Sequence, residues 1–108
     1  MIPSKELLSE VLNDKKILLS KNDLLIGDNV LLFDNQCNYL VNINIYELAH
    51  KCKEWAKKKE YWAISGYDEG YFCMLHDMPD NRFFNASTEI EAIFKACEYI
   101  MEQTKCGS

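Results

Sequence analysis

The sequence has few of the residues that phosphate loops, metal centres and catalytic sites need. Its four glycines are scattered, so there is no glycine-rich loop to cradle a phosphate. Only two histidines occur, His50 and His76, and no Cys-x-x-Cys pair is present. Cys73 and His76 have ligand-like spacing, but residues three apart on a strand point to opposite faces. These absences predict a protein without cofactor, metal or enzymatic activity.

Positive charge is also scarce, which disfavours nucleic acid as a partner. The chain carries 17 acidic and 12 basic residues, a net charge of −5, whereas phosphate-backbone binding depends on clustered Lys and Arg. Arg82 is the single arginine, so bidentate base readout is poorly supplied. The acidic residues alternate with lysines instead of forming the long stripes that a DNA mimic needs.

Long apolar runs are missing as well. No stretch approaches the roughly 18 apolar residues of a membrane span, and the first residues, Met1 to Glu6, lack the basic-then-apolar order of a secretion signal. The five cysteines are an odd number and are interpreted as reduced thiols, with Cys52 and Cys97 packed as small hydrophobes. We therefore expect a protein without membrane contact, located in the cytoplasm of whatever cell makes it.

Apolar periodicity and capping residues predict three helices. A short helix spans Lys5 to Asn13 behind the N-cap Ser4. A longer one begins between Asn42 and Ile45 and ends near Lys59, and its Asn44 and Glu47 form a capping box. The last begins at Ser87 or Thr88, with Glu91 completing a second capping box, and ends near Thr104.

Short alternating runs between the helices predict strands. The expected strands are Ile17–Ser20, Leu24–Ile26, Val30–Phe33, Tyr39–Val41, Tyr61–Ser65, Tyr71–His76 and Arg82–Ala86. At 108 residues the chain is expected to be one domain, residues 1–108. The prediction is an α+β fold, an antiparallel sheet flanked by helices like an α/β/α sandwich, in the order α-β-β-β-β-α-β-β-β-α.

The hairpin strands at 61–65 and 71–76 carry bulky residues on both faces. Strands of this kind usually lie in a sheet that is covered on both sides. The pattern therefore predicts helices above and below the sheet, or a partner that covers one face.

Candidate binding residues fall into two groups. Tyr67 and Tyr71 flank a turn, and Phe83 lies beside Arg82; aromatic residues and Arg are enriched at interface centres. The alternative for these aromatics is packing in or at the edge of the core. Lys51, Lys53 and Lys57 on the middle helix, with Arg82, are candidates for anion contacts.

Part of the chain, from about Ile43 to Glu102, resembles small phage and prophage proteins of the kind called the phage ABA-sandwich domain. The shared features are an amphipathic helix ending in Trp55, a lysine-rich link, a hairpin opening with Tyr61-Trp62, and entry into the last helix. The most specific part is the phrase Ala86-x-Thr88-x-x-Glu91-Ala92-Ile93-x-x-Ala96. Residues 14–42 are longer and richer in strands than that pattern. The resemblance implies a mobile-element origin and no established catalytic residues.

Three hypotheses for function follow. The leading one is a small, acidic, non-enzymatic phage- or prophage-type protein that binds a host or phage protein, for instance as an anti-defence antagonist of a host defence or regulatory protein. The second is binding or sequestration of a small molecule such as a nucleotide signal, with lysines contacting the phosphates and tyrosines stacking on the base. The third is a structural module that forms a homo-oligomer.

Overall fold

The computed structural model describes residues 2–77 and 80–106, which fold into three α-helices and two three-stranded antiparallel sheets. The α+β class predicted from the sequence is confirmed, with two sheets where the sequence suggested one. The chain divides into two compact units, one up to Leu48 and one from Ala49 onward, and each is described by itself. None of the described helices has the length and apolar content that a bilayer span needs.

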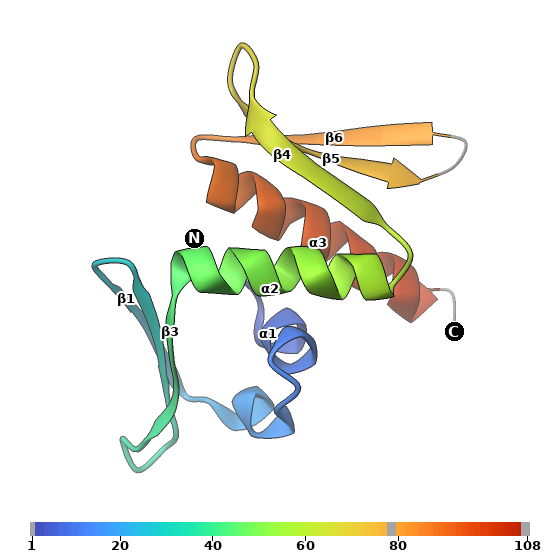
Figure 1. Cartoon of the computed structure of the whole chain (residues 1–108). Coiled ribbons are helices and arrows are strands. Elements are labelled where there is room, and N and C mark those ends of the chain that lie inside the picture. The colour runs from blue at the N-terminus through green and yellow to red at the C-terminus, as the bar shows by residue number, and fades with distance from the viewer. Residues whose placement is uncertain (1, 78–79, 107–108) are drawn as a thin grey trace. The chain divides into compact units, whose positions relative to one another are not determined.

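The first unit combines two short helices with the first sheet. Its elements are α1 (Lys5–Val11), the 3₁₀ helix η1 (Lys15–Leu19), β1 (Asn22–Ile26), β2 (Asn29–Phe33) and β3 (Tyr39–Asn44) (Figure 1). The sheet order is β1-β2-β3, with β2 in the centre. Apolar side chains from α1, η1, β2, β3 and the first turn of the next helix form the core: Leu7, Leu8, Ile17, Val30, Leu31, Leu32, Ile43 and Leu48. No residue of β1 belongs to this core.

The prediction of a strand at Ile17–Ser20 is wrong, because most of this segment lies in the 3₁₀ helix η1. The side chain of Asp14 accepts a hydrogen bond from the backbone N–H of Lys16 at 3.0 Å, which caps the turn at its start. At its end the backbone N–H of Ser20 donates to the carbonyl of Ile17 at 3.0 Å. The buried Ser20 hydroxyl donates to the carbonyls of Asn22 and Phe33, 3.1 Å from each, and thereby fixes the chain as it enters β1.

Helix α2 (Ile45–Lys58) begins in the first unit and continues into the second. Its predicted N-cap is confirmed, since Asn44 Oδ1 accepts a hydrogen bond from the N–H of Tyr46 at 2.9 Å. This is the second helical amide, whereas the capping-box pattern pointed to the third. The residues of α2 within the second unit that are buried are Ala49, Cys52, Trp55 and Ala56.

The second unit continues with the second sheet and the last helix. Strands β4 (Trp62–Tyr67), β5 (Tyr71–Asp77) and β6 (Asp80–Ala86) form a meander with β5 in the centre, and α3 (Glu89–Cys106) follows (Figure 1). The predicted cap of α3 is confirmed, because Thr88 Oγ1 accepts a hydrogen bond from the N–H of Glu91 at 3.1 Å. The Glu91 carboxylate in turn accepts one from the Ser87 hydroxyl at 2.9 Å.

Helix α3 is buried on two sides, against the sheet and against α2. It contacts all three strands of the sheet, and the Cys97 thiol donates a hydrogen bond to the carbonyl of Cys52 on α2. Its buried residues are Ala92, Ile93, Phe94, Ala96, Cys97, Ile100 and Met101. Among the described residues of this unit no helix packs on the opposite face of the sheet, which therefore has helical cover on one side only.

Candidate functional site

The face of the second sheet that points away from α3 is the main candidate for a binding site. Alternation along the strands places Trp62, Ile64 and Gly66 of β4 on this face, with Phe72, Met74 and His76 of β5 and Asn81, Phe83 and Asn85 of β6. We call these residues the outward face. Trp62, Ile64 and Phe83 are 59%, 52% and 61% exposed, whereas Cys73 and Leu75, which point to α3, are fully buried.

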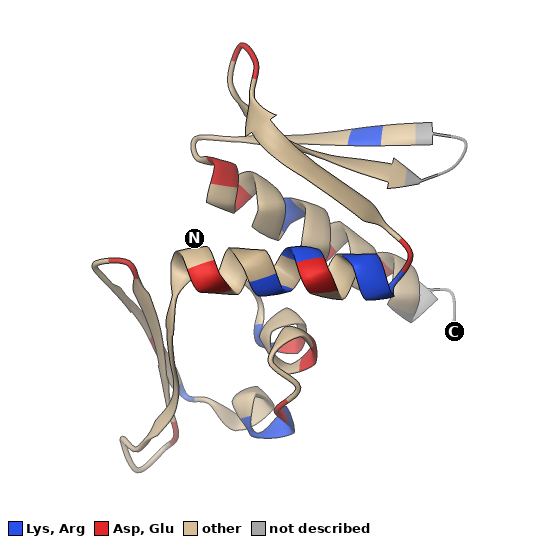
Figure 2. Ribbon diagram, viewed as in Figure 1, with Lys and Arg blue, Asp and Glu red and all other residues tan. Residues whose placement is uncertain are grey.

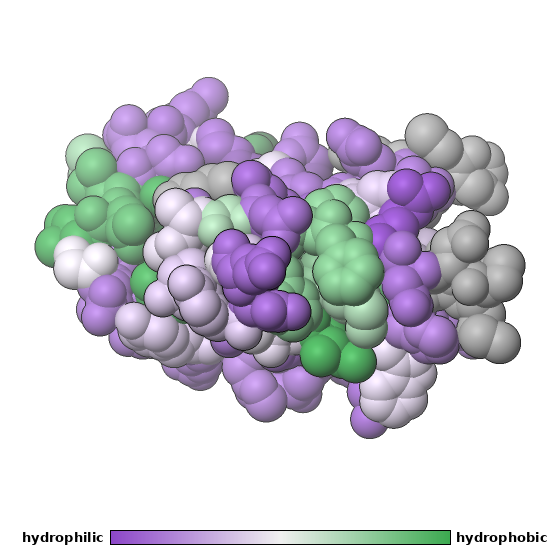
Figure 3. Space-filling model, turned by 90° about the horizontal axis from the view of Figure 1, so that it is seen from above, coloured by the Kyte–Doolittle hydropathy of each residue, from purple (hydrophilic) through white to green (hydrophobic). Residues whose placement is uncertain are grey.

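The outward face has an apolar centre, formed by Trp62, Ile64, Phe72, Met74 and Phe83, and polar residues around it. None of the described residues on it is Lys, Arg, Asp or Glu, although charged residues make up 27% of the chain. Figure 3, which views this sheet from above, shows hydrophobic residues gathered side by side. Single exposed hydrophobic residues are common on protein surfaces, but contiguous ones rimmed by polar residues mark interaction sites.

Contacts within the outward face order its side chains. The rings of Phe72 and Phe83 pack with their centroids 6.1 Å apart. The small residue Gly66 lies directly opposite Phe72 and leaves space for its ring, which would be 3.6 Å from a Cβ atom at position 66. His76 Nδ1 and Asn81 Oδ1 are 2.6 Å apart and share a hydrogen bond. The face is thus preformed, which lowers the entropy cost of binding a partner.

The structure divides the four predicted interface residues. Phe83 lies on the outward face, as the interface interpretation requires. Arg82 alternates to the other side, where its guanidinium is 5.0 Å from the ring centroid of Tyr99 on α3. The neighbouring Phe84 also packs against Tyr99, at 5.5 Å between ring centroids. Arg82 therefore contributes to the packing of α3 on the sheet.

Tyr67 and Tyr71 form a pair at the end of the β4–β5 hairpin. They are directly opposite in the register, and their rings make an edge-on contact with centroids 5.0 Å apart. Both are exposed, but they lie on the same side of the sheet as Cys73. The two tyrosines and Phe83 are consequently not members of one patch.

Two of the three lysines predicted to contact anions line a shallow groove beside the outward face. Lys53 and Lys57 of α2, with Tyr61 and Trp62, line a groove of about 210 Å³. The Lys57 ammonium lies 5.3 Å from the centroid of the Trp62 ring, a cation–π distance. Lys51 is exposed and lies outside this groove. Since pockets for drug-sized ligands measure roughly 300–1,000 Å³, the groove is too small for a nucleotide and instead extends the rim of the outward face.

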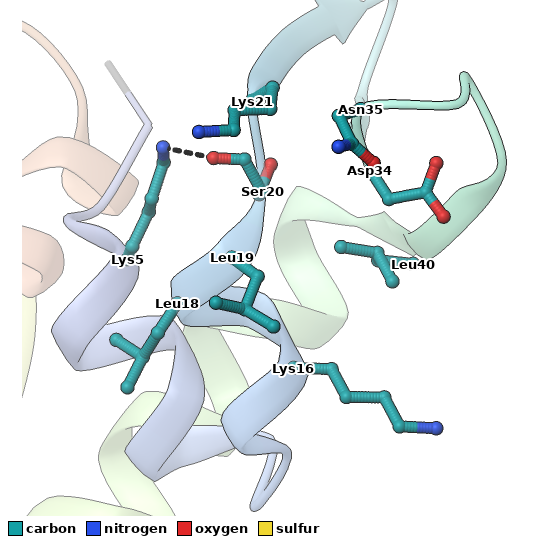
Figure 4. A pocket seen from close by; sticks show the side chains of 9 residues that line it. All are labelled: Lys5, Lys16, Leu18, Leu19, Ser20, Lys21, Asp34, Asn35 and Leu40. Carbon is teal, nitrogen blue, oxygen red and sulfur yellow. Dashed lines mark hydrogen bonds between the residues drawn. The ribbon is translucent and has the colours of Figure 1, made fainter.

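A larger pocket of about 660 Å³ lies in the first unit (Figure 4). Lys5, Lys16 and Lys21 bring positive charge to it, and the leucines 18, 19 and 40 supply its apolar wall. Lys5 is already engaged, since its ammonium donates a hydrogen bond to the carbonyl of Ser20. No aromatic ring lines this pocket, so it offers no surface on which a base could stack.

The carboxylate in this pocket, Asp34, serves the turn between β2 and β3. The backbone N–H groups of Asn38 and Gln36 donate to Asp34 Oδ1 at 2.9 Å and 2.8 Å. These bonds, that from Asn38 foremost, hold the pKa of the Asp34 carboxyl below its usual value. Asp34 is therefore an ionised turn cap.

The thiols of Cys73 and Cys97 are buried, which makes them poor nucleophiles. Burial raises the pKa of the Cys73 thiol to about 12, and the hydrogen bond with Cys52 together with burial raises that of Cys97. A thiol needs its thiolate form to attack.

His76 points to the opposite face of β5 from Cys73, as their spacing predicts. His50 lies on the exposed side of α2, with its Nε2 atom 2.9 Å from Oε1 of Glu54. Within residues 2–77 and 80–106 no three His, Cys, Asp or Glu side chains are grouped as metal ligands.

Trp62 and Ile64 are exposed on the outward face, but the sequence analysis did not name them as interface candidates. The bulky residues on both sides of the hairpin strands predicted either a second helix layer or a partner, and the sequence did not tell which side would stay open. That side follows from where α3 packs, which is a property of the tertiary structure. A usable signal is that Ala63 and Ser65, which alternate with Trp62 and Ile64, are small and leave room for a helix.

The charge distribution along α2 agrees with the mixed pattern of the sequence. Lys and Glu side chains alternate along this helix (Figure 2), and no uniform basic stripe forms on it. Comparison of the chain with protein families, with curated proteins and with solved structures finds no match.

Proposed function

We propose that this chain is a non-enzymatic binding protein of the phage or prophage type, which docks a host defence or regulatory protein on the outward face of β4–β6. The observation that carries the proposal is the exposure of Trp62, Ile64 and Phe83 on a preformed, uncharged sheet face. Aromatic residues are enriched and charged residues depleted at interface centres. The groove with Lys53 and Lys57 supplies the charged rim.

The size of the outward face suits a protein more than a small ligand. Two aromatic side chains and an isoleucine, each more than half exposed, adjoin the partly exposed Phe72 and Met74, so apolar side chains extend over all three strands. A standard protein interface buries about 800 Å² on each partner and has aromatic residues enriched at its core.

Nucleotide binding is the second hypothesis, and the cavities favour it less. The groove that has aromatic rings has too little volume, and the pocket that has the volume has no ring. A thermal-shift experiment with mono- and dinucleotides tests it directly. Stabilisation that is lost in Lys53→Ala and Lys57→Ala would favour this hypothesis over protein docking.

The decisive experiment is affinity capture of a partner with matched surface variants. Tagged wild-type protein, Phe83→Lys and Tyr67→Lys are each incubated with lysate of a bacterial host, and bound proteins are identified by mass spectrometry. Phe83 and Tyr67 are both exposed aromatic residues of the same sheet, but only Phe83 lies on the outward face. We expect one stoichiometric partner that Tyr67→Lys retains and Phe83→Lys loses.

Two outcomes would contradict the proposal. A partner that binds Phe83→Lys as well as the wild type would place its site elsewhere on the chain. A purified protein that captures nothing but turns over a substrate would make it an enzyme. The variants are compared by circular dichroism beforehand, because a lost partner is informative only if the fold is intact.

A further inference from the structure

Strand β1 is an edge strand with apolar side chains exposed on both of its faces. All five residues of β1 are exposed, and Leu24, Leu25 and Ile26 expose 48%, 44% and 59% of their surface. Hydrophobic residues also gather over the β1–β2 hairpin at the left of Figure 3. The strand is paired with β2 on one side, and no described strand pairs with its other side.

The open side of β1 presents unpaired backbone groups. In an antiparallel pair alternate residues direct their N–H and C=O groups to the neighbouring strand, and the residues between them direct theirs outward. Proteins usually protect such an edge with lysine, proline, a bulge or a covering segment. Residues 22–26 contain no lysine and no proline, and Asp23 at the start of the strand is their one charged residue. The irregular register of this sheet falls between β2 and β3. The edge thus has the properties of a template for strand addition.

We propose that β1 pairs antiparallel with β1 of a second copy of the chain, so that two three-stranded sheets join across a twofold axis. The register that fits places Leu25 opposite Leu25 of the second copy. Leu24 then lies opposite Ile26 of the second copy on one face of the joined sheet, and every apolar residue of β1 meets an apolar residue. Asp23 lies opposite Gly27 of the second copy and meets no like charge.

Other twofold registers with the same faces matched are worse for this sequence. If Leu24 lay opposite Leu24 of the second copy, Asp23 would lie opposite Leu25 of the second copy. With Asp23 opposite itself, two carboxylates would meet directly, which destabilises a strand pair. The apolar run Leu24-Leu25-Ile26 is therefore self-complementary in one register, and this selects a second copy over an unrelated strand as the occupant.

This inference is independent of the proposed function. Strand β1 belongs to the first unit and the outward face to the second.

Sedimentation velocity over a series of concentrations tests the pairing with charge variants at its centre. We compare the wild type with Leu25→Lys, with Leu25→Glu and with an equimolar mixture of the two. The wild type is expected to dimerise. Each variant alone is expected to dimerise at least about 100-fold more weakly, because like charges would then face each other where two leucines met. The mixture is expected to recover a dimer, since Lys would face Glu.

Phe83→Lys is the control, because it places the same charge on an exposed apolar residue of the other unit, and it should dimerise like the wild type. Circular dichroism and thermal unfolding confirm that each variant is folded. A wild type that stays monomeric at all concentrations would overturn the inference, as would a dimer that Leu25→Lys leaves intact or that Phe83→Lys dissociates. Variants that dissociate singly but fail to associate when mixed would overturn the register.

Discussion

The Cys97 thiol of α3 donates a hydrogen bond to the backbone carbonyl of Cys52 in α2, at 3.6 Å between sulfur and oxygen. Cys73 of β5 is buried on the side of the sheet on which α3 packs. The three cysteines act as small hydrophobes that let α3 approach its neighbours closely. Burial raises the pKa of the Cys73 and Cys97 thiols, and this makes stability depend on pH in the alkaline range.

The first prediction concerns Cys73. Its pKa rises from 9.0 in a model thiol to about 12 in the folded chain because of burial. Below pH 9 the thiol is protonated in both states and stability is unaffected. Between pH 9 and 12 the unfolded chain releases this proton while the folded chain keeps it, so the free energy of unfolding falls by up to about 1.4 kcal/mol per pH unit. Denaturant titrations at increasing pH measure the slope.

The variant Cys73→Ala isolates the contribution of this thiol. Lysines and tyrosines also titrate in the alkaline range, but the variant shares them, so the difference between the two slopes belongs to Cys73. We expect a shallower slope above pH 9 for the variant. Parallel slopes would mean that the folded chain lets the Cys73 thiol ionise.

The second prediction compares two phenylalanines of the same unit. Phe94 is 1% exposed in α3, whereas Phe83 is 61% exposed on the outward face. Phe94→Ala should lower the free energy of unfolding by about 3–5 kcal/mol, since it leaves a cavity where the buried ring packs beside α3. Phe83→Ala should change it by less than about 1 kcal/mol. Urea denaturation followed by circular dichroism measures both, and equal losses would show that the outward face belongs to the core.

The helices and the β4–β5 hairpin could be predicted from the sequence because their signals are local. Asn44 and Thr88 are caps whose hydrogen bonds form within a few residues. The segment Ile17-Leu18-Leu19 has no such signal, since three consecutive apolar residues fit a strand and a helical turn equally well. The hydrogen bond from the backbone N–H of Lys16 to the Asp14 carboxylate stabilises the helical turn.

The candidate site could be predicted only in part, for a physical reason. Phe83 and Arg82 are adjacent in sequence, and adjacent strand residues point to opposite faces. Which of them becomes accessible depends on the side that α3 covers. Here α3 covers the side of Arg82 and leaves Phe83 with Trp62 and Ile64. The sequence therefore indicated aromatic residues as interface candidates, and the packing of α3 determines which of them lie on the open face of the sheet.

The third prediction concerns a serine whose hydroxyl has no partner. Ser65 Oγ of β4 is buried and forms no hydrogen bond with the described residues. Ser65→Ala removes this unsatisfied group, so the free energy of unfolding should stay the same or rise by up to about 1 kcal/mol. Ser87→Ala is the comparison, because the Ser87 hydroxyl donates a hydrogen bond to Glu91. This variant should lower the free energy of unfolding by about 0.5–1.5 kcal/mol. A loss at Ser65 as large as that at Ser87 would indicate that the Ser65 hydroxyl is hydrogen-bonded.

The last prediction compares two glycines of the β4–β5 hairpin. Gly70 has a φ of +146°, a conformation that other residues adopt only with strain. A Cβ atom at Gly70 would meet no other atom within 4 Å, so any cost of Gly70→Ala comes from the backbone alone. We expect a loss of about 1–3 kcal/mol in the free energy of unfolding.

Gly66→Ala provides the control within the same hairpin. Its Cβ would make an ordinary contact with the Phe72 ring at 3.6 Å, and its φ is not positive, so the change should stay within about 0.5 kcal/mol. Both variants are measured by urea denaturation. If Gly70→Ala costs no more than Gly66→Ala, the hairpin turn can adopt another conformation. The edge contact between Tyr67 and Tyr71, which that turn joins, would then not depend on glycine at position 70.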